Sequence, residues 1–381
     1  MSESSTSLLE SPVQSAVVTE STGVVERSVD PKTGRVPGLD GLRAVAILFV
    51  ILSKAVHSPG FPIPDPYEIA GLLGGMGVDL FFVISGFLIT SLLIREQNRT
   101  GTVSLRDFYI RRALRIMPAY FTYLAALACL QIFQIESFTP LGWISALTWT
   151  TNIFDCDSWD LGHLWSLSVE EHFYLIWPLL FCLLPNRTAM RVIWASFAVV
   201  FVTRWIVLID FPQYTELARF WTWTRYDPIA AGCLLAYFTQ DAGWSKALDR
   251  LSCRSWFWPM VSLGLIGTVG LMLISTKSRI GFAFTTGTVA ISLLVWGVVR
   301  RPRRWMEGFL NHPALVQVGV LSYSLYLWHR LVLRPPHLSW DWTWIPLNLL
   351  ELTVLAVACH YLVERPFLKL KDRWSRRSRT E

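Results

Sequence analysis

Apolar stretches of about 20 residues recur along the whole chain, and short polar or basic segments separate them. An α-helix rises about 1.5 Å per residue, so about 20 apolar residues are needed to cross the hydrocarbon core of a bilayer. Candidate spans are found at residues 42–57, 75–94, 117–135, 165–184, 190–209, 226–239, 256–275, 281–299, 315–333 and 344–363. The pattern predicts an all-α integral membrane protein, a bundle of about ten transmembrane helices.

One further segment, residues 144–154, is apolar but shorter and rich in threonine. It is too short to cross the hydrocarbon core, so we expect an interfacial or re-entrant piece within a loop. An eleventh full span here would invert every later loop. It would also place the basic run Arg300–Arg304 outside the cell, which argues against it.

The basic residues between the predicted spans fall on one side of the bundle, as expected for cytoplasmic loops. These loops contain Arg95, Arg99, Arg106, Arg111, Arg112 and Arg115, then Lys246, Arg250 and Arg254, then Arg300, Arg301, Arg303 and Arg304. The segments 58–74 and 136–164 contain no Lys or Arg. We therefore expect both termini in the cytoplasm and a multi-pass protein of the cell (inner) membrane. Residues 1–36 are predicted to be a disordered cytoplasmic tail, and residues 369–381 a basic one.

Composition agrees with a protein in contact with the lipid bilayer, because 52% of the residues are hydrophobic and only 16% are charged. The net charge of +6 does not indicate a nucleic-acid partner, since the basic residues form short runs between apolar segments. The six cysteines form no CxxC pair, so neither a metal site nor a disulfide framework is predicted.

Ionisable residues inside the predicted spans are the main functional signal, because each costs several kcal/mol unless it is paired or faces a wet cavity. These residues are Arg43, Lys54, Asp79, Glu170, Glu171, His172, Arg225, Asp227 and His329. A simple membrane anchor would not accumulate so many. The pattern favours an enzyme or a transporter with a polar cavity between its helices.

Six motifs in a fixed order give the chain a family resemblance. They read DGLRAVAILFVILS, GVDLFFVISGFLIT, FYIRRALRIMPAYF, HLWSLSVEEHFYLIWPLL, RYDPIAAGCLLAYF, and SYSLYLWH with VERPF. Together they resemble the membrane acyltransferase-3 family of O-acyltransferases, with residues 37–368 as the transmembrane domain. The resemblance implies transfer of an acyl group, commonly acetyl, from cytoplasmic acyl-CoA to a hydroxyl of a carbohydrate or related acceptor. Acyl-CoA is thus expected as a co-substrate, no bound cofactor is expected, and we expect no further domain after residue 381.

The first predicted span departs from the family pattern. Family members carry an Arg, ten intervening residues, and then a His that is thought to be the catalytic base. Counting from Arg43, the position of that His is occupied by Lys54. Eleven residues bring both side chains to one helix face, roughly 16 Å apart along the axis. The resemblance implies that Arg43 holds a polar group of CoA and that position 54 lies at the point of acyl transfer.

Three interpretations of Lys54 are open. Lysine is ordinarily protonated at neutral pH, so as a base it would first have to lose its proton in a desolvated site. His57, three residues further on, offers a second route. In the third interpretation the chain is a CoA-binding pseudoenzyme in which a fixed positive charge replaces the base. A transporter without chemistry is a further alternative.

The candidate site residues fall into three groups. Catalytic candidates are Lys54, Glu170, Asp79 and His57. Donor-binding candidates are Arg43, Arg111, Arg112 and Arg115, although the arginines of the loop also serve as topology signals. Candidates for the acceptor site or the cavity are His163, Trp165, Arg225, Asp227, Tyr326 and His329.

Overall fold

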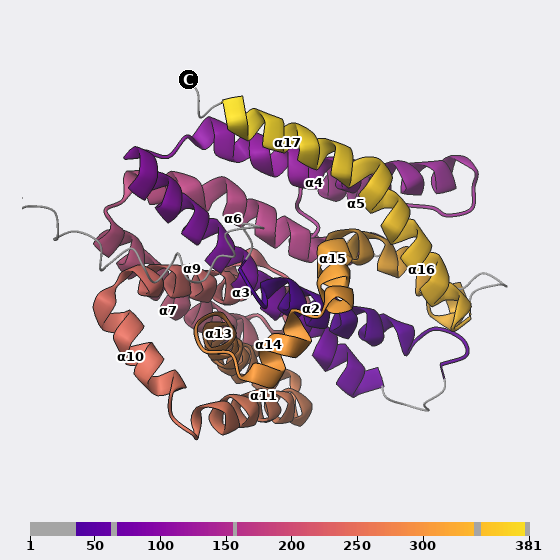
Figure 1. Cartoon of the computed structure of the whole chain (residues 1–381). Helices are drawn as coiled ribbons and strands as arrows, with labels where there is room; N and C mark the ends of the chain where they lie inside the picture. Colours follow the sequence, from indigo (N-terminus) through magenta and orange to yellow (C-terminus); the bar gives the residue numbers. More distant parts are fainter. Residues whose placement is uncertain (1–35, 62–66, 155–157, 339–343, 378–381) are drawn as a thin grey trace, which may run out of the picture.

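The computed structural model describes residues 36–61, 67–154, 158–338 and 344–377, and within these ranges all regular structure is helical (Figure 1). The predicted tail at residues 1–36 lies outside the described residues except for Val36, and so does Cys156. The prediction of an all-α fold is confirmed for the described part of the chain.

Each predicted span coincides with a helix. In chain order these are α2 (Leu39–Ala55), α3 (Tyr67–Thr100), α4 (Leu105–Ile132), α6 (Leu164–Leu183), α7 (Asn186–Asp210), α9 (Asp227–Gln240), α11 (Phe257–Ile274), α13 (Phe284–Arg300), α15 (Pro313–Val332) and α16 (Leu347–Ala358), which continues into η5 (Cys359–Glu364). Shorter helices join them: α5 (Pro140–Leu147), α8 (Thr222–Arg225), α10 (Ala242–Ser252), α12 (Thr276–Ser278), α14 (Arg304–Leu310) and the C-terminal α17 (Arg365–Arg377). The ten-span count and the cytoplasmic position of both termini stay predictions.

Among the described residues, 6 helices are long and apolar enough to cross a membrane. They include α3, α4, α7 and α11, the helix that ends with α13, and the helix that begins with α16. Helices α2, α6, α9 and α15 do not meet this criterion, because they are shorter or more polar. These four helices carry most of the ionisable residues that the sequence singles out.

Burial differs strongly between the helices, and the most enclosed ones include α9 and the apolar α3, of whose apolar window 78% is buried. Twelve of the 14 residues of α9 are buried, whereas only 28% of the apolar window of α7 and 22% of that of α11 are buried. A helix that faces lipid must be apolar around its exposed side, but a helix enclosed by protein can carry paired polar groups. The arrangement therefore places the functional candidates at the centre.

Close helix contacts at glycine hold this centre together. At the crossing of α3 and α9, a Cβ on Gly86 would clash with the carbonyl oxygen of Ile229, and a Cβ on Gly232 would clash with that of Val83. Small residues allow helix backbones to approach closely, which is the main source of packing energy between helices in a membrane. The crossing fixes the relative height of the residues on α3 and α9.

Helix α5 covers part of the segment that the sequence singles out as short. It has 8 residues and is about 12 Å long, so it does not cross a bilayer. Its N-cap Thr139 accepts a hydrogen bond from the backbone N–H of Gly142 at 3.0 Å. The prediction that this segment is not a full span is confirmed.

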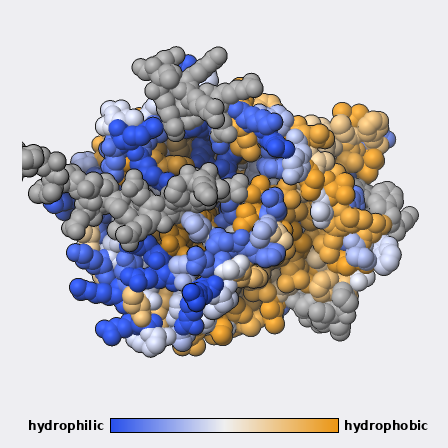
Figure 2. Space-filling model, in the orientation of Figure 1, coloured by the Kyte–Doolittle hydropathy of each residue, from blue (hydrophilic) through white to orange (hydrophobic). Residues whose placement is uncertain are grey.

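Helix α17 extends the fold into the segment predicted as a basic tail. It runs beside α4 (Figure 1), and the Trp374 indole donates a hydrogen bond to Asp107 of α4 at 3.0 Å. Figure 2 shows hydrophilic residues on the side of α10 and α14, whereas the side of α5 and α16 is largely hydrophobic. The face seen in this view is thus divided between a polar and an apolar region.

Candidate functional site

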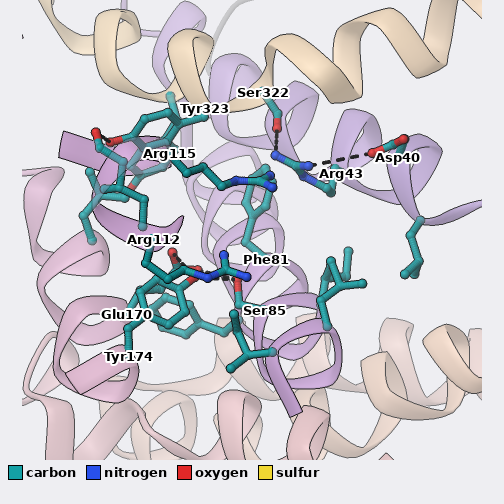
Figure 3. Close-up of a pocket in the computed structure, with 18 of the residues that line it drawn as sticks. Asp40, Arg43, Phe81, Ser85, Arg112, Arg115, Glu170, Tyr174, Ser322 and Tyr323 are labelled. Carbon is teal, nitrogen blue, oxygen red and sulfur yellow. Dashed lines mark hydrogen bonds and ion pairs between the residues drawn. The ribbon is translucent and has the colours of Figure 1, made fainter. Parts of the chain in front are cut away.

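A cavity of about 640 Å³ lies between α2, α3, α4, α6, α15 and the C-terminal helices. Its volume falls within the range of about 300–1,000 Å³ that is usual for ligand sites. The polar and aromatic residues in its lining include Asp40, Arg43, Phe81, Ser85, Arg112, Arg115, Glu170, Glu171, Tyr174, Ser322, Tyr323, Tyr326, His360 and Glu364. Six separate segments of the chain thus meet around one space, and part of its lining is drawn in Figure 3.

Arg43, Arg112 and Arg115 belong to the cationic part of the lining, which also includes Arg95 and Lys371. Arg43, in the first turns of α2, donates a hydrogen bond from Nη2 to Ser322 Oγ at 2.9 Å, and its Nη1 lies 3.7 Å from Asp40 Oδ1. Arg112 and Arg115 are three residues apart on α4 and therefore share a helix face. Neither forms an ion pair with any residue in the described ranges. The positive charges of Arg112 and Arg115 can therefore bind an anionic group that enters the cavity.

Glu170 of α6 supplies a carboxylate to the same cavity. Ser85 of α3 donates a hydrogen bond to its Oε1 at 2.8 Å, and Tyr174, one turn further along α6, donates to its Oε2 at 3.2 Å. The Arg112 guanidinium lies over the Tyr174 ring, 5.4 Å from its centroid. These contacts fix the carboxylate in orientation while it stays in the cavity lining.

A second carboxylate, Glu364 of η5, lies in the cavity lining together with His360. His360 Nδ1 is 2.9 Å from Glu364 Oε2, and Ser324 of α15 donates a hydrogen bond to Glu364. Glu364 belongs to the VERPF motif, but neither residue was predicted from the sequence as part of the site. Their spacing of four residues, which places a histidine and a carboxylate on one helix face, could have indicated the pair.

Tyr326 connects the cavity with a group of buried aromatic rings. Its hydroxyl donates a hydrogen bond to the backbone oxygen of His163 at 2.9 Å, and Ser166 Oγ lies 2.5 Å away. The rings of His163 and His329 are 5.1 Å apart, and His329 Nδ1 lies 2.6 Å from the backbone oxygen of Tyr326. Of the six acceptor or cavity candidates, Tyr326 lines the cavity, while the two histidines lie behind it.

Trp165 lies outside the cavity lining. Its ring packs against Phe82 and Phe220, with centroid distances of 6.0 and 5.1 Å. Its position is explained by the packing of α6 against α3.

Lys54 lies in the last turn of α2 and is not among the residues that line the cavity. Its Nζ is 5.4 Å from the centroid of the Trp159 ring, and the Arg330 guanidinium carbon is 4.1 Å from the same centroid. His57, in the turn after α2, also lies outside the lining. Neither of these two catalytic candidates therefore lines the cavity that contains Glu170 and Arg43.

Asp79, Arg225 and Asp227 belong to a closed cluster outside the cavity. Arg225 pairs with Asp79, and Arg204 Nη2 lies 2.5 Å from Asp227 Oδ1, with at most 3% of each side chain exposed. Thr288 also donates to Asp227 at 3.3 Å. Arg204 of α7 was missed by the sequence analysis, although a single arginine in an apolar span is itself a signal of a buried partner.

Arg111 points away from the cavity that Arg112 and Arg115 line. Its Nη2 is 2.8 Å from Glu96 Oε2, and the two side chains are 26% and 18% exposed. Adjacent residues on a helix lie about 100° apart, which explains why Arg112 faces the cavity and Arg111 does not. Ser85, Tyr174 and Ser322 were not predicted from the sequence, since an uncharged polar residue in a predicted span gives little indication of a functional role.

Comparison with known proteins gives the family. Residues 36–363 match the family model of an acyltransferase domain. O-acetyltransferase OatA of Staphylococcus aureus (strain NCTC 8325 / PS 47) is 32% identical over 317 residues, which cover 77% of this chain and 50% of that protein. "Putative O-acetyltransferase SACOL0978" of Staphylococcus aureus (strain COL) is 28% identical over 365 residues, with 88% and 57% covered.

The chain spans about half the length of these relatives, at 50% and 57% of their sequences. No solved structure shows a significant match. The family match covers the helices from α2 to α16 and most of η5, whereas Glu364 and α17, which also line the cavity, lie outside it. The chain therefore belongs to the acyltransferase-3 family.

Proposed function

We propose that the chain is a multi-pass membrane O-acyltransferase that moves an acetyl group from cytoplasmic acetyl-CoA to a hydroxyl of a carbohydrate or related acceptor. One observation carries this proposal: Arg43, Arg112 and Arg115 face Glu170 across a single cavity between helices. The names of the relatives, O-acetyltransferases, support acetyl as the acyl group.

The three arginines are suited to the phosphates of CoA. A guanidinium binds phosphate through two parallel hydrogen bonds, and such charge-assisted bonds are about twice as strong as neutral ones. Arg112 and Arg115 make no ion pair within the described part of the chain, so binding a phosphate would break no existing pair. We assign donor binding to Arg43, Arg112 and Arg115 and leave Arg111 with Glu96.

Glu170 is the group best placed to accept the proton of the acceptor hydroxyl. Of the four catalytic candidates it is the one that lines the cavity. In the proposed step the hydroxyl oxygen bonds to the acyl carbon, the carbon–sulfur bond of the thioester breaks, and the hydroxyl proton moves to Glu170. The proton then passes to the CoA thiolate. Ser85 and Tyr174 orient the carboxylate throughout.

The consumption of acetyl-CoA tests this function directly. The purified chain in detergent is given acetyl-CoA with a panel of sugars, and the free CoA thiol is followed with a chromogenic thiol reagent. We expect acceptor-dependent thiol release from the native chain and none from Glu170→Gln. An intact thioester with every acceptor would contradict the proposal. Measured CoA binding would then separate a pseudoenzyme, which binds CoA, from a transporter without affinity for it.

We also propose that about ten helices cross the membrane, with both termini in the cytoplasm. The distribution of Lys and Arg between the helices supports this topology. In a variant without native cysteines, Leu105→Cys and Arg303→Cys should be protected from an impermeant thiol reagent in intact cells, and Pro62→Cys should be labelled. Labelling of Arg303→Cys from outside would contradict the topology.

A further inference from the structure

Two basic side chains share one tryptophan ring outside the cavity. Lys54 ends α2, Arg330 lies near the end of α15, and Trp159 is in the connection before α6. The Lys54 ammonium and the Arg330 guanidinium lie 5.4 and 4.1 Å from the centroid of the Trp159 ring, and the Trp159 indole donates to the backbone oxygen of Arg330 at 2.7 Å. We call these three residues the cation cluster.

Neither Lys54 nor Arg330 forms an ion pair with a described residue. Asp160 is close enough to Arg330 to act on its charge, although both of its carboxylate oxygens accept hydrogen bonds from Arg334 Nη2 at 2.9 Å. Arg334 also pairs with Glu136, so two carboxylates offset the two arginines, and Lys54 is the cation of the cluster that has no counter-charge in the described part of the chain. A third cation, Arg219, is close enough to repel the charge of Lys54. Arg219 is itself paired with Glu216 at 2.7 Å.

Partial burial makes this excess of positive charge costly, since both Lys54 and Arg330 are half-buried. The Nε atom of Arg330 is shielded from solvent and has no hydrogen-bond partner among the described residues, and the same holds for Nδ1 of His163, whose ring lies 5.1 Å from that of His329 next to Arg330. Two like charges drawn together without a counter-charge destabilise a fold. Contact with the Trp159 ring offsets part of this cost for each cation. An anionic ligand would supply the missing charge and the missing acceptor.

The cation cluster lies on the helix faces that also line the cavity. Lys54 is eleven residues from Arg43 on α2, and Arg330 is four residues from Tyr326 on α15, so each pair shares a face. Arg43 and Tyr326 are both in the cavity lining. A molecule held at the cluster would therefore lie along the same two helices, about 16 Å from Arg43 on α2.

We propose that Lys54 and Arg330 bind an anionic group of the acceptor, a carboxylate or a phosphate ester, and so select acidic acceptors for acetylation. This inference rests on the proposed function. It gives Lys54 a binding role that needs the charged ammonium, whereas a base would need the neutral amine. Trp159 keeps the two cations in place through its ring and its indole hydrogen bond.

Matched acceptors test the selection. Acetyl transfer is measured with methyl glucuronide against methyl glucoside, and with glycerol 3-phosphate against glycerol. We expect kcat/KM to be about tenfold or more higher for the anionic member of at least one pair, as for a lost or gained charge-assisted contact. The pair with the larger ratio shows whether the anion is a carboxylate or a phosphate.

Variants test whether the preference for anionic acceptors depends on Lys54 and Arg330. Lys54→Gln and Arg330→Gln should each lower the ratio about tenfold, while Lys54→Arg, which keeps the charge, should preserve it. Lys246→Gln removes an exposed charge from α10 and is the matched control. Unchanged acetyl-CoA affinity in each variant shows that the protein is folded.

Binding without turnover separates this proposal from the proposed function. Equilibrium dialysis with radiolabelled methyl glucuronide and glycerol 3-phosphate needs no acetyl-CoA. If no thioester is consumed but an anionic probe binds native protein and not Lys54→Gln, the transferase function fails and the anion site stands. Equal binding of anionic and neutral probes, or an unchanged preference in both glutamine variants, overturns the anion site.

Discussion

Two groups of buried charges in this protein differ in how they are neutralised. In the closed cluster of α3, α7, α8 and α9, Asp79 pairs with Arg225 and Asp227 pairs with Arg204. In the cavity, Arg112 and Arg115 have no ion-pair partner among the described residues, and Glu170 accepts hydrogen bonds from the uncharged Ser85 and Tyr174. Both groups contain arginines and carboxylates deep in a membrane bundle.

The comparison teaches that burial of a charge inside a membrane protein does not by itself mark a functional site. The closed cluster holds four helices together, and the Arg225 guanidinium carbon lies 3.9 Å from the centroid of the Phe284 ring. Both carboxylates of this cluster are paired with an arginine, so neither is left for a ligand. The cavity keeps its charges available, at the cost of stability. Variants in each group should therefore differ in effect, with losses of activity at the cavity and losses of stability at the closed cluster.

The strongest effect on activity is expected at Glu170. Glu170→Gln keeps the size of the side chain and one oxygen that accepts from Ser85 or Tyr174, while its amide nitrogen can donate to the other hydroxyl, but it removes the proton acceptor. Turnover of acetyl-CoA should fall by about 10² to 10⁴, the usual contribution of a positioned base. Affinity for CoA and the unfolding transition should change little. Retained turnover in this variant would place the base elsewhere.

The strongest effect on stability is expected in the closed cluster. Asp79→Ala leaves the Arg225 charge buried without its partner and should lower the free energy of unfolding by about 3–5 kcal/mol. Denaturation with sodium dodecyl sulfate in mixed micelles measures this change. The double variant Asp79→Leu with Arg225→Met should recover much of the loss. An unchanged stability of Asp79→Ala would mean that the cluster does not hold the helices together.

A smaller effect is expected on donor affinity. Arg43→Ala should weaken CoA binding by about 1.5–3 kcal/mol, the value of a hydrogen bond to a charged group. Arg111→Ala is the matched control, since this partly exposed arginine is paired with Glu96 and should change CoA binding by less than about 1 kcal/mol. Isothermal titration with CoA measures both. Equal losses in the two variants would indicate general electrostatic attraction rather than a site at Arg43.

The smallest effect is expected from Lys54→His with a neutral acceptor. If Glu170 is the base, an imidazole at position 54 should leave turnover of methyl glucoside about unchanged, because proton transfer takes place at the cavity. A gain of about 10² to 10⁴ would show instead that position 54 is the base site and that the lysine has disabled it. Steady-state kinetics at neutral pH distinguishes these outcomes.

Much of the fold could be predicted from the sequence because membrane helices follow a local rule. Each of the ten apolar stretches coincides with a helix in the described residues, since a backbone in lipid must satisfy its hydrogen bonds within the segment. Segment 144–154 was correctly excluded as a span from its short length and from the inversion of the later basic loops that an eleventh span would cause. The family could be identified in the same way, from motifs that are contiguous in the chain, and residues 36–363 match it.

The sequence by itself thus determined the class of fold, the family and the list of ionisable residues inside the spans. Only the tertiary structure decided which of them share a space, because helix rotation and crossing are set by contacts far apart in the chain, such as Gly86 against α9. In that geometry Arg111 pairs with Glu96 while Arg112 lines the cavity, and Asp79 pairs with Arg225. Arg330 and Lys54 contact the same Trp159 ring. Spacing along one helix fixes a face, but the partner opposite that face comes from the packing of the whole bundle.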